Sequence, residues 1–336
     1  MNRKLLHNLL LLCIVLCMVM GITGCDGGMP PGSDKNENGH DKIQVLCTTF
    51  PLYDWTRQIA GESDTVEVSL LLVNGVDMHS YQASAADIAR ISSCDVLVYA
   101  GGTSDAWLFD VLQNHANKDM IQVNLTEVLK DDVRREEYVE GMQKENHDDD
   151  GHDEEYDEHI WLSVKNAVLC CEAVKNSLCS VDTGNADLYE VQCRDYTDKL
   201  LQLDAEYADM VGKAKRDTVL FADRFPFLYL MKDYDIRYYA AFPGCSSETA
   251  ASFETVAFLA GKLKEENIGY VLTIENAGNG FALELAQTII ENAGVQAKVL
   301  AMDSMQSVTK AQIDGGLTYY SVMEQNLEVL KEAMNE

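Results

Sequence analysis

A long run without proline, residues 187–214, is the feature that most constrains the fold of this 336-residue chain. Its apolar side chains recur at spacings of three and four residues, as on one face of an α-helix: Leu200, Leu203, Tyr207, Met210 and Val211. A helix of about 28 residues measures about 42 Å at a rise of about 1.5 Å per residue. A helix of this length is a stiff connector, so we expect the parts it joins to move little when a ligand binds.

On both sides of this run, short apolar segments typical of strands alternate with segments of helical spacing. The predicted strands cover residues 43–50, 66–72, 95–100 and 121–124 before the run, and 218–222, 236–240, 270–274 and 297–301 after it. Such alternation is typical of α/β architecture. We therefore predict two Rossmann-like α/β lobes, residues 43–181 and 217–336, joined by one long rigid connecting helix within residues 182–216, with a ligand site in the cleft between them.

The first 24 residues are typical of a secretory signal rather than of the fold. A short basic head precedes the almost wholly apolar residues 5–20, and small residues then lead to Cys25. The apolar stretch is too short and wrongly flanked for a stable transmembrane helix. Residues 22–25 resemble a bacterial lipobox, which predicts lipid on Cys25 and attachment to the outer face of a membrane; the alternative is an ordinary soluble secreted protein. Residues 25–42 lack the apolar side chains of a core and are predicted to be a flexible tether.

Charge and cysteine content narrow the class of protein further. The chain has 55 acidic and 26 basic residues and a formal charge of −29, which argues against a nucleic-acid partner. The charge suits a protein that collects cations, although a role in solubility would give the same balance. Of the ten cysteines, Cys13 and Cys17 lie in the signal and Cys25 is the lipidation site, which leaves seven. An odd number cannot all pair, and we expect most of them to pack as small apolar thiols.

The most acidic stretch, residues 145–158, directly precedes His159 and an apolar segment. Ser163 is placed to cap the helix that this segment begins. Carboxylates and imidazoles bind divalent cations, and we predict that the loop captures the ion exchangeably through His147, His152, Asp148, Asp149, Asp150 and Asp153. The alternative is a solvated tether beside a packed histidine. Deletion of residues 148–157 is predicted to weaken capture and to leave the tight site intact.

Polar side chains also follow the predicted strands of both lobes. His79 comes after the second strand, Asp223 after the fifth and Glu275 after the seventh. Because ligands bind at the carboxyl ends of strands in open α/β sheets, we expect these residues and His159 to meet in the cleft. Two imidazoles with carboxylate oxygens suit Zn²⁺ or Mn²⁺, whereas Ca²⁺ and Mg²⁺ prefer oxygens alone.

Three segments resemble the motifs of the zinc- and manganese-binding solute-binding lipoproteins of bacterial ABC importers. Residues 75–81 with Asp87 resemble G-x-D-P-H-x-Y…D, residues 94–101 with 107–108 resemble A-D-L-V-x-x-x-G…W-L, and residues 157–163 with 166–167 resemble D-P-H-x-W-L-S-P-x-N-A. The resemblance covers residues 43–331. It implies two lobes with a rigid helix, a metal site in the interlobe cleft and delivery to a membrane permease with its ATPase. An acidic or histidine-rich loop before the second histidine is typical of the zinc branch.

The sequence departs from this family at the third ligand, because Ala222 stands where the family usually has histidine or glutamate. The replacement is left open between Asp223, Glu275 with a water or an extra carboxylate, Cys245, and Glu248. Of these, we expect Cys245 to be structural rather than a ligand.

These observations predict a monomeric, extracytoplasmic, lipid-anchored protein that captures Zn²⁺ and delivers it to an ABC permease, and that is not an enzyme. Mn²⁺ is the alternative cargo, because two histidines with oxygens serve either ion. A zinc hydrolase is less favoured, since the sequence has no H-E-x-x-H or G-x-S-x-G motif. A surface adhesin or a binder of organic ligands would need an apolar, aromatic-lined cleft.

Overall fold

The computed structural model describes residues 42–73, 75–114, 117–143, 156–246, 250–275 and 280–335. The predicted signal, Cys25 and nearly all of the tether lie outside the described residues. So do Glu248 and the predicted capture residues His147, His152, Asp148, Asp149, Asp150 and Asp153. Within the described part of the chain, no helix combines the length and the apolar character that crossing a membrane requires.

The first lobe is built on a four-stranded parallel sheet with the order β2-β1-β3-β4. Its strands are β1 (Ile43–Cys47), β2 (Val66–Leu70), β3 (Val96–Tyr99) and β4 (Ile121–Asn124). Successive side chains of a strand point to opposite faces. Val45 and Val98 therefore pack with α2 (Phe50–Ala60) and α6 (Val164–Val181), and Leu97 packs with α3 (Ala85–Ser93) and α4 (Ala106–Asn114). The short helix α5 (Leu125–Leu129) follows β4.

The second lobe repeats this strand order, as β6-β5-β7-β8, again with all neighbours parallel. The strands are β5 (Thr218–Phe225), β6 (Arg237–Pro243), β7 (Tyr270–Ile274) and β8 (Lys298–Met302). On one face, Leu220 and Val271 pack with α9 (Phe253–Glu265) and α10 (Phe281–Ala293). On the other, Phe221 and Leu272 pack in the core that includes α8 (Leu228–Asp233) and α12 (Tyr319–Asn335). The five-residue helix α11 (Lys310–Asp314) precedes α12.

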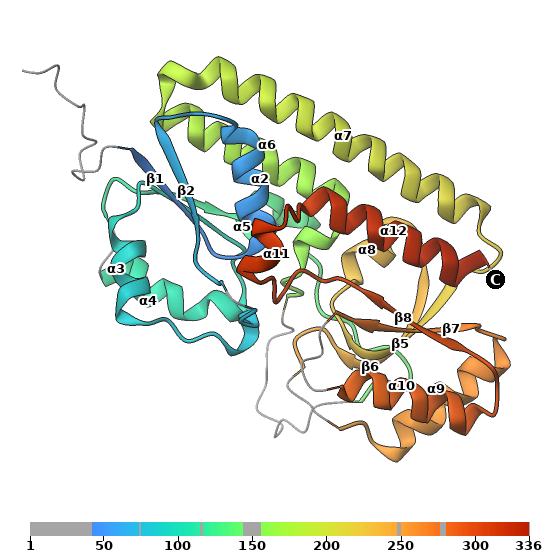
Figure 1. Ribbon diagram of the computed structural model, residues 1–336. Helices are drawn as coiled ribbons and strands as arrows, with labels where there is room; N and C mark the ends of the chain where they lie inside the picture. Colours follow the sequence, from blue (N-terminus) through green and yellow to red (C-terminus); the bar gives the residue numbers. More distant parts are fainter. Residues whose placement is uncertain are drawn as a thin grey trace, which may run out of the picture. The chain divides into compact units, whose positions relative to one another are not determined.

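The long helix α7 (Ala186–Lys213) connects the two lobes and packs on α2 and α6 of the first and on α12 of the second (Figure 1). Its buried face includes Leu200, Leu203 and Tyr207, and the Tyr207 hydroxyl donates to the Met323 carbonyl of α12 at 2.6 Å. One apolar core runs from α2 through α7 to β5 and α12. The predicted fold, two parallel α/β lobes with one long helix, is therefore confirmed.

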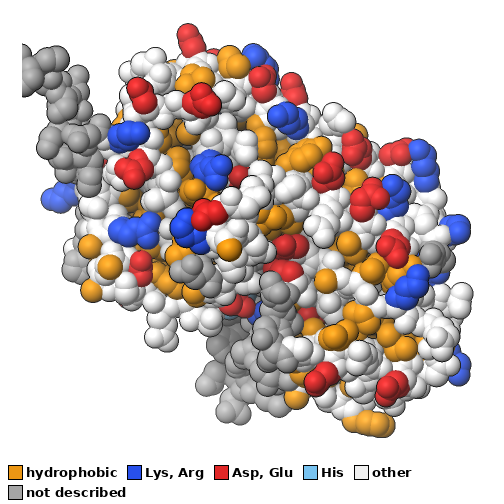
Figure 2. All heavy atoms as spheres, in the orientation of Figure 1, with side chains coloured by type: hydrophobic (Ala, Val, Ile, Leu, Met, Phe, Trp, Pro, Cys, Tyr) orange, Lys and Arg blue, Asp and Glu red, His pale blue; other side chains and the backbone are white. Residues whose placement is uncertain are grey.

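The solvent-facing sides of α7 and α12 carry many charged side chains, although Val191 and Leu201 of α7 are also exposed. Figure 2 shows acidic and basic side chains interspersed along these helices, where Lys213 pairs with Asp209 at 2.6 Å and Lys331 with Glu328 at 3.0 Å. Such exposed pairs within one helix stabilise it by only about 0.3–0.5 kcal/mol each. The apolar core, rather than surface charge, therefore holds the helices in place.

The prediction that the fifth strand ends at residue 222 is wrong. Strand β5 continues to Phe225, and its pairing with β6 shifts register between Phe221 and Arg224. A bulge of this kind inserts extra backbone without ending a strand. Asp223 therefore lies inside the sheet instead of following it.

Candidate metal centre

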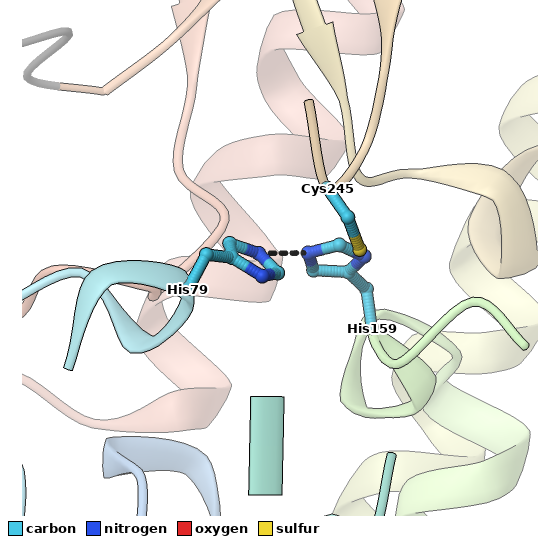
Figure 3. Close-up of side chains that lie close together, drawn as sticks. All are labelled: His79, His159 and Cys245. Carbon is cyan, nitrogen blue, oxygen red and sulfur yellow. Dashed lines mark hydrogen bonds between the residues drawn. The ribbon is translucent and has the colours of Figure 1, made fainter. Parts of the chain in front are cut away.

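The site begins with two imidazoles from separate turns of the first lobe. His79 lies in a short 3₁₀ turn, Met78–Ser80. Asp77 caps the start of this turn, because its side chain accepts a hydrogen bond from the backbone N–H of His79. His159 immediately precedes a second 3₁₀ turn, Ile160–Leu162, and Ser163 then caps α6 by accepting from the N–H of Asn166. The Nε2 atoms of the two rings face each other at 3.3 Å (Figure 3).

Oxygen atoms hold the other nitrogen of each ring. The Nδ1–H of His159 donates to Asp157 Oδ1 at 2.9 Å, because a carboxylate can only accept, and this leaves a lone pair on His159 Nε2. His79 Nδ1 lies 2.9 Å from Ser104 Oγ, a hydroxyl that can donate or accept. Such support orients metal-binding histidines and fixes their tautomers. Burial lowers the pKa of His79 to about 3, and the neighbouring His159 adds to the lowering. At neutral pH, His79 is therefore uncharged and able to bind a cation.

Cys245 brings a thiol to these rings from the second lobe. It lies in the turn after β6, and its Sγ and one nitrogen of each imidazole lie within 4.8 Å of one another. This is the group of three such side chains that the described residues place close enough to hold one ion, and Figure 3 shows the thiol beside His159. Zinc bonds to nitrogen and sulfur are about 2.0–2.3 Å long. The three donors must therefore lie slightly closer together than 4.8 Å to share one ion, and small side-chain rotations would bring them there.

Gly244 allows this approach. A Cβ atom at Gly244 would lie 3.0 Å from His159 Cε1 and 3.0 Å from the Phe225 carbonyl oxygen, which is tighter than ordinary contact. The backbone N–H of Cys245 donates to Glu136 Oε1 at 3.2 Å, so the turn is also held by the first lobe. A bulkier residue at position 244 would move either the turn or the ring.

Gln306 completes the surroundings of His159 from the loop after β8. Its Nε2 contacts His159 Nε2, and its Oε1 is buried without a hydrogen-bond partner among the described residues. Gln306 is not among the residues predicted from the sequence. The rule that ligands gather after strand ends would have included it, but an uncharged amide gives no signal of its own.

Asp223 does not join this group. It is buried within β5, where Oδ1 accepts from the Arg224 N–H at 2.8 Å and Oδ2 from the Ile274 N–H at 3.0 Å. One oxygen therefore binds within β5 and the other fastens β5 to β7. Burial raises the pKa of the carboxyl group. Ala222, at the family's third-ligand position, is buried in the apolar cluster on the other side of the sheet.

Glu275 is also outside the group that the described residues form. Its two oxygens accept from the Ser304 N–H at 2.6 Å and the Ser304 hydroxyl at 2.8 Å. Burial raises the pKa of Glu275 to about 8, with the neighbouring Asp303 carboxylate adding to the rise. Of the four ligands predicted in the cleft, the structure thus brings His79 and His159 together and uses Asp223 and Glu275 for structural hydrogen bonds. It adds Cys245, which we expected to be structural.

The end of the acidic loop belongs to the support of the site. Tyr156 pairs with Arg135 in an isolated antiparallel bridge, and the Asp157 N–H donates to the Arg134 carbonyl at 2.9 Å. Because Asp157 holds both the ring and the N–H of His159, the prediction that deletion of residues 148–157 spares the tight site needs correction. A deletion that tests the loop must end before Tyr156.

Comparison with known proteins gives a consistent assignment. The model of a family described as "Zinc-uptake complex component A periplasmic" (ZnuA) matches residues 45–333. The chain is 31% identical over 296 residues to the zinc-binding lipoprotein AdcA of Streptococcus pneumoniae strain R6, covering 88% of this chain and 56% of that protein. The chain thus spans about half the length of that relative. It is 27% identical over 328 residues to the high-affinity zinc uptake system protein ZnuA of Bacillus subtilis, covering 96% of both.

Solved structures agree with the fold. The Zn(II)-bound ZnuA-like domain of S. pneumoniae AdcA matches with a TM-score of 0.67 and 28% identity, over 88% of this chain and 100% of that one. The metal-dependent lipoprotein YcdH of B. subtilis matches with a TM-score of 0.70 and 26% identity, over 87% and 99%. The chain therefore belongs to the ZnuA family of periplasmic zinc-uptake components.

Proposed function

We propose that this protein captures Zn²⁺ outside the cytoplasm and delivers it to a membrane ABC permease and its ATPase. The observation that carries the proposal is the convergence of His79, His159 and Cys245, whose thiol sulfur and one nitrogen of each imidazole lie within 4.8 Å of one another. The zinc-binding and zinc-uptake names of the relatives support the cargo and the role. The ion is substrate here, bound stoichiometrically and handed on, and not an agent of catalysis.

The donor set favours zinc over the alternative, manganese. A thiolate and two imidazoles are softer ligands than the carboxylates that suit Mn²⁺, and zinc precedes manganese in affinity at sites of this kind. A manganese site is expected to be rich in oxygen ligands. The carboxylates of Asp223 and Glu275 instead accept hydrogen bonds from backbone N–H groups and from Ser304.

The remaining parts of the proposal rest on the sequence. Lipid on Cys25 would anchor the protein to the outer face of the membrane, where a monomer can meet its permease. The acidic residues of the loop, with His147 and His152, would raise the local concentration of cations beside the tight site. Transport rather than enzymatic catalysis is supported by the family, whose description is a component of an uptake complex.

Competition with a chelator of known affinity tests the proposal. The fragment from Lys42 is expected to bind one Zn²⁺ tightly. His79→Ala, His159→Ala and Cys245→Ser are each expected to weaken binding by more than about 100-fold, the upper end of the loss caused by removing an outer-shell partner. Cys179→Ser, which changes a partly exposed thiol on α6, is the matched control. Wild-type zinc affinity in all three site variants would contradict the proposal, as would turnover of ester or peptide substrates by the zinc-loaded protein.

A further inference from the structure

Zinc binding at His79 dictates where the protons of its neighbours lie. A neutral imidazole carries one proton, so a ring whose Nε2 binds a metal carries that proton on Nδ1. His79 Nε2 is the atom that faces His159, and Nδ1 lies 2.9 Å from Ser104 Oγ. In the zinc-bound form the Nδ1–H therefore donates to the hydroxyl oxygen, and the hydroxyl proton of Ser104 has to donate to a different acceptor.

The carboxylate of Glu158 offers that acceptor. Its Oε1 accepts from the backbone N–H of Ser104 at 2.8 Å, whereas its Oε2 is buried and has no hydrogen-bond partner among the described residues. Burial raises the pKa of the Glu158 carboxyl group, and interactions with the N–H and the hydroxyl of Ser104 oppose that rise. The hydroxyl is thus close enough to act on this carboxylate. A buried oxygen without a donor costs free energy, and a hydrogen bond from the hydroxyl would remove that cost.

The backbone around these side chains leaves room for Glu158 and holds Ser104 in place. Glu158 is only 2% exposed, and a Cβ atom at Gly102 would lie 2.6 Å from Glu158 Cγ, so the acid packs directly against the glycine backbone. Ser104 lies in a 3₁₀ turn, Thr103–Asp105, in which the Asp105 N–H donates to the Gly102 carbonyl at 3.2 Å. Because the turn and the acid are both fixed, the hydroxyl proton can change direction without the backbone having to move.

We propose that Glu158 is a positioning residue of the zinc site, which accepts a hydrogen bond from the Ser104 hydroxyl and thereby holds His79 with its proton on Nδ1 and its Nε2 free for the ion. The inference rests on the proposed function and extends it to the support of His79. Two successive acids then serve the two rings, because Asp157 holds His159 directly and Glu158 holds His79 through Ser104. Glu158 stands at the proline of the D-P-H motif that this segment resembles, and proline has no side-chain acceptor.

Chelator competition on variants of the purified protein tests the inference. Glu158→Gln keeps the shape of the side chain, but the Ser104 N–H requires its single oxygen. The NH₂ group would then meet the Ser104 hydroxyl as a second donor, so zinc binding is expected to weaken by about tenfold or more. Ser104→Ala is expected to cause a loss of the same order, whereas Ser104→Thr keeps the hydroxyl and is expected to stay close to the wild type. Glu332→Gln is the matched control, since Glu332 accepts from the Tyr270 hydroxyl at 3.0 Å within the second lobe.

The double variant shows whether Glu158 acts through Ser104. In protein that already carries Ser104→Ala, the further change Glu158→Gln is expected to cost little additional affinity, because the hydroxyl through which the acid acts is gone. Equal losses from Glu158→Gln with and without the hydroxyl would overturn the inference. Wild-type zinc affinity in either single variant would overturn it too.

Nitrogen-15 NMR of the histidine rings adds a readout that a purely structural role of Glu158 would not change. In the zinc-loaded wild type, the Nδ1–H of His79 is expected to exchange slowly with water, because it donates to Ser104 Oγ. Exchange is expected to be faster in Glu158→Gln and in Ser104→Ala, and unchanged in Glu332→Gln; unchanged exchange in Glu158→Gln would count against the inference. If His79→Ala and Cys245→Ser lose zinc while Glu158→Gln does not, only this inference fails. If those two site variants also bind zinc as the wild type does, the proposed function fails as well.

Discussion

At the scale of single residues, the Asp157 carboxylate orients the His159 ring for metal binding. Asp157 accepts from Nδ1 of the ring at 2.9 Å and from the His159 backbone N–H at 2.8 Å. It thereby keeps the proton on Nδ1, leaves the lone pair on the Nε2 atom that faces His79, and fixes the plane of the ring. The acid is therefore a positioning residue and is not itself a ligand in our proposal.

Asp157→Ala is expected to weaken zinc binding by about 10–100-fold, the usual effect of removing a partner behind a metal-binding histidine. The fold is expected to persist, because α6 keeps its own cap at Ser163. Chelator competition and circular dichroism measure the two effects separately. An Asp157→Ala variant with wild-type zinc affinity would show that His159 needs no such support.

Glu275 carries a second prediction, which concerns pH. Its pKa rises from 4.5 to about 8 in the folded protein, so the folded chain keeps a proton that the unfolded chain releases between these values. Stability therefore falls as pH rises from 4.5 towards 8. Glu275→Gln removes this titration. As pH rises from 4.5 to about 8, the melting temperature of the wild type is therefore expected to fall relative to that of the variant.

The same variant separates a structural role from a metal-binding role. Glu275→Gln is expected to keep zinc affinity close to that of the wild type, because Glu275 binds Ser304 and lies outside the group around His159. A large loss of affinity would instead support the prediction from sequence that Glu275 is a ligand.

At the scale of elements, the turn after β6 supplies what β5 lacks. This chain has Ala222 at the position in β5 where the family usually has a ligand. The turn after the neighbouring strand β6 instead places Cys245 beside His79 and His159. The exchange depends on Gly244, which lets the backbone pass the edge of His159.

Gly244→Ala is expected to weaken zinc binding by about tenfold, comparable with the loss of an outer-shell partner, because the new Cβ would press on His159 Cε1 from 3.0 Å. Gly261→Ala is the matched control, since a Cβ there meets nothing within 4 Å among the described residues. Gly261 lies inside α9, where alanine stabilises a helix by about 0.5–1 kcal/mol relative to glycine. Equal zinc affinities in the two variants would show that the turn adapts to the added methyl group.

Elements also show where prediction from sequence works and where it stops. Strands such as residues 270–274 and the helix α7 were predicted because their own apolar spacing identifies them. The end of β5 was predicted wrongly, because a bulge that prolongs a strand leaves no mark in that spacing. Cys245 and Gln306 depend on how loops of the folded second lobe approach His159, and no local pattern records such an approach. The ligand roles of His79 and His159, which strand ends and family motifs both indicated, stay predictions until a metal is measured.

At the scale of the whole molecule, a continuous apolar core joins the lobes. It runs through α2, α7, β5 and α12. Two polar contacts add to it: Asp54 Oδ2 accepts from the Tyr319 N–H at 2.9 Å, and Arg224 pairs with Asp77 at 3.1 Å beside His79. Hinge closure over the ligand would have to break this packing, so we expect small movements on loading.

Small-angle scattering checks this expectation. The backbone of a preorganised binding partner moves by about 1 Å or less on binding, so the radius of gyration of the fragment from Lys42 is expected to stay nearly unchanged when zinc binds. A larger contraction would mean that the lobes close on the ion and that α7 does not hold them as the packing indicates.

The donors of the proposed zinc site come from both lobes, with His79 and His159 before α7 in the chain and Cys245 after it. A ligand that binds only the native state lowers the population of every opened form. Zinc would thus suppress the local unfolding that exposes a chain to proteases, so carriers that hold their ion should survive longer outside the cell than those that have released it.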